Sequence, residues 1–143
     1  MIPVQVTLKN FLSYQDASLD FSGLHTACIC GSNGAGKSSL LEAITWVVWG
    51  ESRAASEDDV IHTGAKDVRV DFIFEANGQI YRIIRTRRRG SSSALEFQIE
   101  TPQGFKSLTA KGLRATQDEI INHIKLDYDT FINSAYLRQG RAD

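Results

Sequence analysis

The chain has 143 residues, of which 42% are hydrophobic, and its formal net charge is −1 at pH 7. This length and apolar content suffice for one domain with a buried core. The near-zero charge excludes a global electrostatic attraction to nucleic acid or to a membrane surface. No apolar run has the length of a membrane span and the N-terminal residues lack a secretory signal, so we expect a cytoplasmic protein without a membrane partner.

Strands are expected at the start of the chain. Apolar and polar residues alternate over residues 4–9, which is typical of a half-buried strand, and Leu19 and Phe21 indicate a second one. A mostly apolar run over residues 24–30 predicts a buried strand of the kind found in parallel sheets.

The next segment, 31–38, reads GSNGAGKS and fits the phosphate-binding pattern G-x-x-x-x-G-K-[ST] at every specified position. Glycines let the backbone approach a polyphosphate closely, and the amide hydrogens of such a turn point at the phosphate oxygens. Lys37 would add a positive charge at the β- and γ-phosphates, as a catalytic residue, and the Ser38 hydroxyl would hold Mg²⁺. The sequence therefore predicts a nucleoside triphosphate site. Its expected contacts in this loop are Asn33, Gly34, Ala35, Gly36, Lys37, Ser38 and Ser39.

A helix is expected directly after this loop. Its apolar face would consist of Leu40, Leu41, Ile44, Val47 and Val48. Gly50 stands where a helix is commonly capped at its C-terminus. The N-terminus of this helix would face the phosphates, which is the structural context that the motif requires.

The remainder of the chain alternates in the manner of strands before it becomes helical. Residues 51–66 are polar and aperiodic, which predicts a surface loop. An antiparallel meander is then predicted from the runs at 68–74, 79–87 and 95–99, with a tight turn at residues 77–78, a second turn at 90–93 and a further strand at 105–108. A capping box at 116–119 predicts the start of a helix, and a second helical stretch is expected over 129–136. The predicted fold is α/β, with a mixed sheet and the meander inserted after the first helix.

The only dense basic run consists of Arg82, Arg85, Arg87, Arg88 and Arg89. Two interpretations are open: a solvated hairpin arm, or contact with the phosphate backbone of DNA, which needs charge but no base-reading pattern. Because side chains alternate along a strand, Arg85, Arg87 and Arg89 share one face near the distal end of the arm, and they are the predicted DNA-contacting set. Asp71 and Glu75 occupy the polar phase of a hairpin strand, so we interpret them as solvent-facing carboxylates and not as a catalytic acid.

Several segments together resemble the SbcC family, the bacterial ATPase subunit of a double-strand-break repair nuclease complex related to the structural-maintenance-of-chromosomes proteins. These segments are Asn10–Tyr14, Gly31–Ser39, Leu40–Ile44 and Phe131–Gly140. The last of them ends in Tyr-Leu-Arg-Gln-Gly, which is more specific than the phosphate loop.

The resemblance implies a P-loop NTPase fold of the ABC type, in which residues 1–143 form the N-terminal lobe of an ATPase head, without the coiled coil and the C-terminal lobe. It implies that Gln139 is the Q-loop residue, a catalytic contact to Mg²⁺ and the γ-phosphate. It also places the adenosine of ATP between the loop of the first strand, near Asn10–Tyr14, and the segment of Ile61, His62 and Thr63. The implied partners are the protein's own C-terminal lobe, a second head in a homodimer, an SbcD-type nuclease subunit and double-stranded DNA of the nucleoid.

The function expected from this resemblance is ATP binding that powers the processing of DNA ends with a partner nuclease. ATP hydrolysis is expected in the full-length dimer and not in the chain alone. A nucleotide-gated DNA clamp of the chromosome-maintenance type is an alternative, in which closure and not nuclease control is the output. A P-loop kinase of small metabolites is a further alternative, although the sequence shows no complete catalytic set for it.

Overall fold

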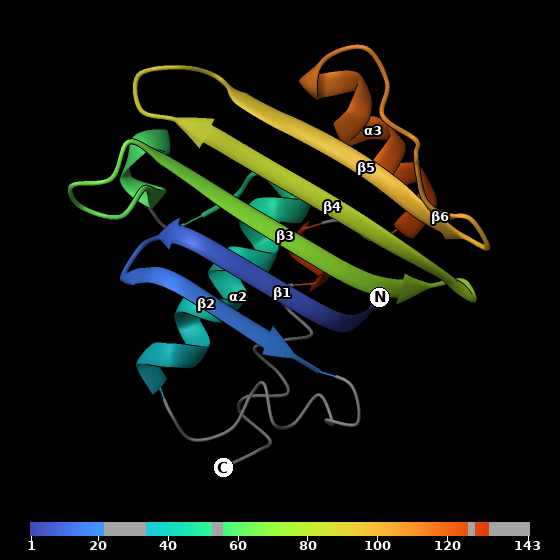
Figure 1. The fold of residues 1–143 in the computed structure, drawn as a ribbon, viewed down its shortest axis with the longest axis horizontal. Helices are drawn as coiled ribbons and strands as arrows, with labels where there is room; N and C mark the ends of the chain where they lie inside the picture. The colour runs from blue at the N-terminus through green and yellow to red at the C-terminus, as the bar shows by residue number, and fades with distance from the viewer. Residues whose placement is uncertain (22–33, 53–55, 126–127, 132–143) are drawn as a thin grey trace.

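The computed structural model describes residues 1–21, 34–52, 56–125 and 128–131. Within these residues the chain forms a six-stranded sheet with its helices on one face (Figure 1). The elements in chain order are β1 (Ile2–Phe11), β2 (Tyr14–Asp20), α2 (Gly34–Trp49), the short 3-10 helix η1 (Glu57–Val60), β3 (Asp67–Ala76), β4 (Gln79–Arg88), β5 (Ser93–Thr101), β6 (Gly104–Ser107) and α3 (Leu113–Ile124).

The sheet has the strand order β2-β1-β3-β4-β5-β6, and every neighbouring pair is antiparallel. The meander predicted from the alternating sequence is confirmed by β3 to β6. Since β1 pairs with β3, this meander continues the N-terminal hairpin in one sheet. A mixed sheet was expected, but the strands in the described part of the chain are all antiparallel; the run at 24–30, which was expected to supply a parallel strand, lies outside the described residues.

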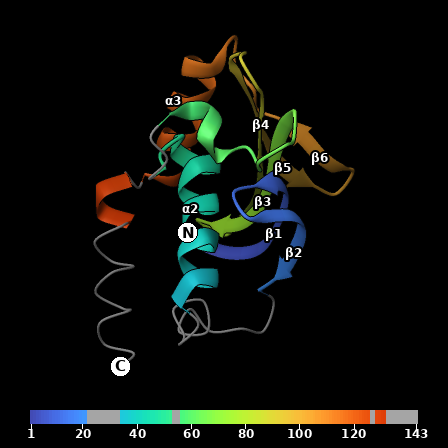
Figure 2. The same ribbon diagram turned by 90° about the vertical axis from the view of Figure 1, so that its left-hand side faces the viewer.

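The helix α2 forms the middle layer of the molecule. It packs against β1, β3 and β4, and α3 packs against β5 and α2. Figure 2 shows the helical residues 128–131 on the side of α2 that faces away from the sheet. The sequence predicted one apolar face for this helix, which was incomplete, since Ala43, Thr45 and Trp46 are also buried. In the described residues no helix has the length and apolar character that crossing a membrane requires.

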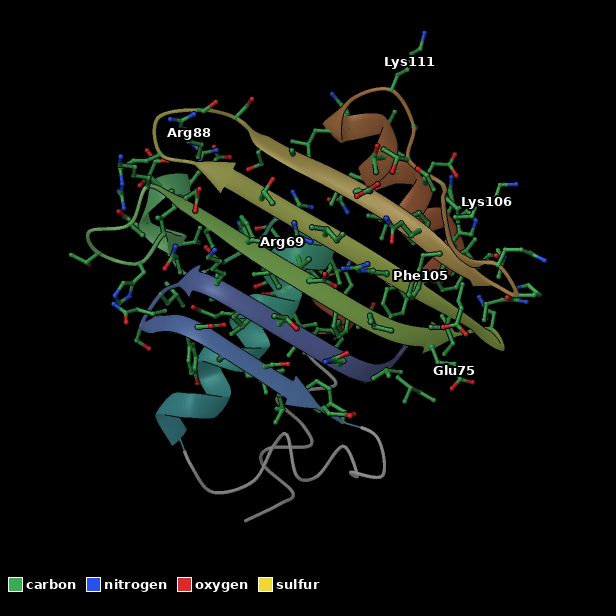
Figure 3. The ribbon with its side chains drawn as sticks, viewed as in Figure 1. Arg69, Glu75, Arg88, Phe105, Lys106 and Lys111 are labelled. Carbon is green, nitrogen blue, oxygen red and sulfur yellow. The ribbon has the colours of Figure 1, made fainter. Side chains whose placement is uncertain are left out.

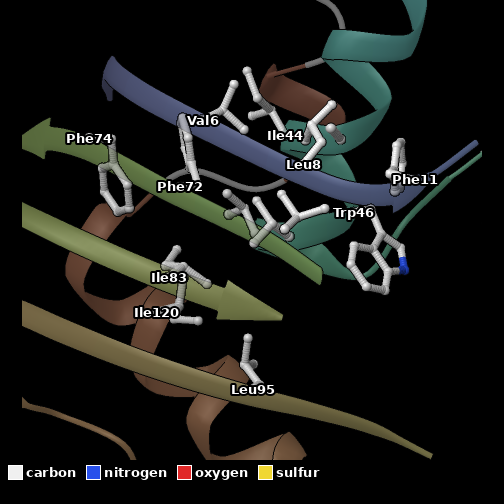
Figure 4. Close-up of a cluster of buried hydrophobic side chains, with 14 of the residues drawn as sticks. Val6, Leu8, Phe11, Ile44, Trp46, Phe72, Phe74, Ile83, Leu95 and Ile120 are labelled. Carbon is white, nitrogen blue, oxygen red and sulfur yellow. The ribbon is translucent and has the colours of Figure 1, made fainter. Parts of the chain in front are cut away.

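The core lies between the sheet and the two α-helices (Figure 4). The inward positions of β3 alternate with more exposed ones, as a period of two predicts, whereas β4 in the middle of the sheet has a run of three buried residues, Ile83, Ile84 and Arg85. Four aromatic rings form a row across the central strands, with centroid distances of 5.3, 5.6 and 5.4 Å between successive members Phe72, Phe74, Tyr81 and Phe97. Burial of one such side chain is worth about 1.5–3 kcal/mol, so this row fixes which face of the sheet meets the helices.

The hairpin predicted between β3 and β4 is confirmed. Asn77 and Gly78 have φ angles of 54° and 75°, the left-handed pair that a two-residue type I′ turn requires. The Asn77 amide also donates a hydrogen bond of 3.0 Å to the His123 carbonyl, which ties the tip of the hairpin to α3.

One local prediction was wrong and one was incomplete. The capping box at 116–119 does not start a helix, because α3 begins earlier, at Leu113, with Gly112 as the residue before it. Thr116 lies inside the helix and is fully buried, and its hydroxyl donates to the Gly112 carbonyl over 2.8 Å. The expected surface loop over 51–66 contains η1, and its apolar pair Val60 and Ile61 is buried in the core, because two adjacent apolar residues suffice to anchor an otherwise polar segment.

Gly50 confirms the predicted C-terminal cap of α2. Its φ angle is 75°, and its N–H donates a hydrogen bond of 2.8 Å to the Trp46 carbonyl. A Cβ at this position would lie 3.2 Å from Nη1 of Arg85. Gly78 has the same φ angle of 75°, but a Cβ there would meet nothing within 4 Å.

This pair of glycines separates backbone strain from crowding. Gly78→Ala should destabilise the fold by about 1–2 kcal/mol, the cost of a left-handed alanine. Gly50→Ala should cost more than that, because its methyl group also displaces the Arg85 guanidinium. Urea unfolding followed by circular dichroism measures both values. If both variants lose the same free energy of unfolding, the Arg85 guanidinium moves aside at no measurable cost.

Candidate nucleotide-binding site

The helix predicted to follow the phosphate-binding motif is confirmed as α2, and the second half of the motif lies in its first turns. The helix begins at Gly34, so Gly34, Ala35, Gly36, Lys37, Ser38 and Ser39 all belong to its first turns, whereas Asn33 lies outside the described residues. The first four N–H groups of a helix have no acceptor within it, and the helix dipole adds partial positive charge there. No acidic residue stands in this first turn. This helix end therefore suits an anion such as a phosphate group.

A second part of the site forms where the β1–β2 turn meets the segment after η1. Leu12 N–H donates to the Val60 carbonyl over 2.8 Å, and His62 N–H donates to the Asn10 carbonyl over 2.8 Å. The Nδ1 atom of His62 lies 2.6 Å from the Leu12 carbonyl oxygen. The two segments expected to flank an adenosine, far apart in sequence, are thus held together by backbone hydrogen bonds.

The β1–β2 turn has an unusual backbone that the sequence analysis missed. Asn10 and Leu12 both adopt left-handed φ angles, 56° and 51°. Asparagine tolerates this region, whereas a leucine rarely enters it. Both backbone groups of Leu12 are bound to the segment of Val60 and His62, which holds this conformation in place. A leucine preceding a serine gives no sequence signal for such a turn.

The three residues expected beside the adenosine differ in what they expose. Ile61 is only 4% exposed, so its side chain belongs to the core. A contact between the Ile61 backbone and the adenosine stays a prediction. His62 is half-buried and Thr63 is exposed. Because a carbonyl oxygen can only accept, the His62 Nδ1 must carry the proton that it shares with Leu12. In neutral His62, Nε2 is then an acceptor for an amino or hydroxyl group.

The predicted catalytic residue Gln139 lies outside the described residues. The start of the predicted helical stretch at 129–136 is seen, since residues 128–131 are helical. Two aromatic side chains of this stretch contact the end of α2. The centroid of the Trp49 ring lies 5.2 Å from that of Phe131 and 6.2 Å from that of Tyr128.

Arg85 corrects the prediction for the basic run. It was expected to face solvent in a DNA-contacting set, but it is only 4% exposed. Its Nε donates to the Val47 carbonyl over 3.2 Å, its Nη2 donates to the Gln117 side chain, and its guanidinium stacks 5.8 Å from the centre of the Trp46 ring. Burial lowers the pKa of Arg85 to about 10, so it remains charged at neutral pH.

Arg87 is likewise engaged within the protein. Its side chain is 10% exposed, and it forms ion pairs of 3.0 Å with Glu57 and 2.8 Å with Asp58. The hydrogen bond from Arg87 lowers the pKa of the Asp58 carboxyl. The alternation of the strand was predicted correctly, but its inward face continues to Arg87 because η1 brings carboxylates over it. Of the predicted set, Arg89 alone is exposed.

The open face of the sheet carries the two carboxylates considered above as catalytic acids. Glu75 is exposed on this face, as predicted, and Figure 3 shows it together with Arg69. The Asp71 side chain is only 13% exposed, because it is bound by Arg82 and, at 3.5 Å, by Arg69. The hydrogen bond with Asp71 raises the pKa of Arg82. Asp71 is therefore a neutralised partner in a cross-strand pair.

The chain is similar to known ATPases over nearly its whole length. The family AAA_23, described as an AAA domain, matches residues 5–143. The chain is 34% identical to the SbcC component of the nuclease SbcCD of Deinococcus radiodurans over 99% of its length, and 34% identical to the DNA double-strand break repair Rad50 ATPase of Thermoplasma volcanium over 100%. It spans 16% of the length of each of these relatives.

Solved structures show a similar fold. A structure of the recombination mediator protein RecF covers 83% of the chain with a TM-score of 0.58 at 19% identity, and the match spans 29% of the RecF chain.

Arg85 is buried and Arg88 is exposed on the same strand, β4, and this contrast predicts different effects on the free energy of unfolding. Arg85→Ala should destabilise the fold by about 3 kcal/mol, because it leaves buried acceptors unpaired and opens a cavity. Arg88→Ala, on the exposed end of the same strand, should stay within about 0.5 kcal/mol of the wild type. Urea unfolding at pH 7 measures both.

The lowered pKa of Arg85 also predicts how its contribution to the free energy of unfolding depends on pH. Between pH 10 and its unfolded-state pKa, Arg85 binds fewer protons when folded, so its contribution to stability rises with pH in that window and is constant at neutral pH. Equal stabilities of Arg85→Ala and Arg88→Ala would contradict the buried role of Arg85.

Proposed function

The chain belongs to the AAA_23 family of AAA domains as an SbcC/Rad50-type head region, and we propose that residues 1–143 form the N-terminal lobe of an ABC-type ATPase head in DNA double-strand-break repair. The observation that carries this proposal is that α2 begins at Gly34, within the phosphate-loop motif, with no acidic residue in its first turn, because the N-terminal end of a helix suits a triphosphate. Support also comes from the names of the two relatives, which are a nuclease component and a repair ATPase.

The residues of α2 fit ATP and Mg²⁺. Lys37 would bind the β- and γ-phosphates, Ser38 would hold the metal through its hydroxyl, and Gln139 would contact the metal and the γ-phosphate. The metal supplies charge neutralisation as the γ-phosphate is transferred to water. On the adenosine side, His62 and Thr63 would contribute contacts beside the β1–β2 turn.

We propose that the rest of the catalytic set comes from the protein's own C-terminal lobe and from a second head in a homodimer. Asp71 is bound by Arg82 on the open face of the sheet, and Glu75 lies exposed on that face, so neither carboxylate is placed to activate water at α2. The complete protein would act with an SbcD-type nuclease on double-stranded DNA in the cytoplasm, at the nucleoid. The similarity to repair ATPases favours this function over a small-molecule kinase.

The roles of Lys37 and Gln139 can be separated in the full-length protein. Lys37→Ala should abolish measurable ATP binding, because the phosphates lose the lysine charge of the loop. Gln139→Ala should retain most of the ATP affinity and lose most of the turnover, since it acts on the metal and the γ-phosphate. Calorimetry with ATP and Mg²⁺ and a phosphate-release assay provide the two readouts.

Lys111→Ala is the matched control for lost charge, because Lys111 is exposed near α3. It should bind and hydrolyse ATP as the wild type does. If Lys37→Ala binds ATP with wild-type affinity, the phosphate-loop proposal is wrong.

We propose that DNA contacts the end of the sheet where β4 finishes, through the exposed cations Lys66, Arg88 and Arg89. The N–H of Arg89 donates to the Lys66 carbonyl over 2.8 Å, so the backbones of these two residues are adjacent at this end of the sheet. This set replaces the one predicted from strand alternation, because Arg85 and Arg87 are bound within the protein.

Replacing both Arg88 and Arg89 by Ala should weaken binding of double-stranded DNA by the full complex, without sequence preference. The slope of log affinity against log salt should flatten by up to about two units, since each phosphate contact contributes about 0.9. Lys106→Ala with Lys111→Ala removes the same charge near β6 and α3, away from Arg88 (Figure 3), and should leave the slope unchanged. Identical slopes in both double variants would place the DNA surface elsewhere.

A further inference from the structure

A cavity of about 270 Å³ lies beside the C-terminal end of α2. Its walls combine apolar side chains, namely Trp46, Val60 and Leu113, with serines, two glutamates and the buried Arg85. The volume lies just below the range that is usual for small-molecule sites, so the cavity suits a small ligand. The 16 residues of α2 separate it by about 24 Å, at 1.5 Å per residue, from the phosphate-loop end of the helix.

Arg85 brings a positive charge to this cavity, the Arg85 cavity, that has no ion-pair partner in the described part of the chain. Its Nε donates to the Val47 carbonyl and its Nη2 to the Gln117 side chain, and both acceptors are neutral. Glu57 is the carboxylate whose charge acts on Arg85, but it is bound to Arg87 at 3.0 Å. A buried charge is unfavourable unless it is paired, so Arg85 should attract an anion.

The third nitrogen of the guanidinium, Nη1, is the atom that an anion would reach. It has no hydrogen-bond partner among the residues that the structure describes, unlike Nε and Nη2. A Cβ at Gly50 would lie 3.2 Å from Nη1. Gly50 and Arg85 both line the cavity, so the missing side chain at position 50 leaves Nη1 uncovered on this side.

The other walls indicate what kind of anion fits. Trp46 and Val60 are buried, and the Leu113 side chain at the start of α3 is 40% exposed, so an apolar group in the cavity would cover apolar surface that now meets water. Glu51 and Glu57 line the cavity and are exposed. Their charges oppose a phosphate group or any polyanion more strongly than a single carboxylate.

We propose that the Arg85 cavity binds a small monocarboxylate with a short apolar chain. The carboxylate would accept a hydrogen bond from Nη1 of Arg85, and the chain would lie against Trp46 and Leu113. This site is separate from the phosphate loop and does not depend on the proposed ATPase function, so either can fail without the other.

The test uses the full-length protein with butyrate as the probe and saturation-transfer NMR as the measurement. Butyrate should bind saturably with a Kd of about 1 mM, because it offers one charge-assisted hydrogen bond and a short chain. Butanol has a chain of the same length without the charge, and it should bind at least about tenfold more weakly.

Three variants locate the binding site. Gly50→Ala should weaken butyrate binding at least about fivefold, because its methyl group lies against Nη1. Gly78→Ala is the matched control, since Gly78 has the same φ angle of 75° and nothing within 4 Å, and it should bind butyrate as the wild type does. Lys37→Ala should also retain the wild-type Kd for butyrate, because Lys37 lies at the other end of α2.

The absence of saturable binding, or equal affinities for butyrate and butanol, would overturn the inference. Equal butyrate affinities of Gly50→Ala and Gly78→Ala would overturn it too, because Nη1 would then not be the contact. Loss of binding in Lys37→Ala would place butyrate at the phosphate loop and contradict the Arg85 cavity as its site.

Discussion

The fixing of α2 between the sheet and the rest of the chain is the constraint on which the proposed site depends. Its first N–H groups have no acceptor within the helix, as at any helix start. Its Val47 and Val48 carbonyls, near the other end, accept hydrogen bonds from Arg85 and Gln117. A cation at the C-terminal end of a helix also interacts favourably with the helix dipole. The two ends of α2 therefore differ: the N-terminal end suits an anionic ligand, and the carbonyls at the C-terminal end accept hydrogen bonds from other elements of the protein.

Burial of a guanidinium is unfavourable in itself, which the lowered pKa of Arg85 reflects. The arrangement is tolerated because Arg85 finds a backbone carbonyl, an amide oxygen and an aromatic ring. These three partners come from α2 and α3, so Arg85 links β4 to both helices. An apolar residue at this position would fill the space but would leave the Val47 carbonyl without this donor.

The sequence predicted the features that depend on local pattern. The phosphate loop has a fixed spacing, the Asn77–Gly78 turn has a fixed backbone requirement, and the strands of the meander alternate regularly, so each could be found without any knowledge of tertiary contacts. The failures share a different cause. Thr116 fits a capping box by its spacing, yet α3 already begins at Leu113, directly after Gly112. The Thr116 hydroxyl donates to carbonyls just before the helix, those of Ala110 and Gly112. Leu12 enters a left-handed turn because of bonds to a segment some fifty residues away.

The basic run shows why pattern alone misplaces a charged site. Alternation established that Arg85 and Arg87 share the face that begins with Tyr81 and Ile83, and this was correct. The error lay in assuming that charge at the end of that face implies solvent. Whether an inward arginine is buried depends on acceptors supplied by other elements, here the end of α2 and the carboxylates of η1, and neither is visible in the strand itself. Exposure is therefore the property that separates a nucleic-acid contact from a structural cation, and on β4 it changes between Arg87 and Arg88.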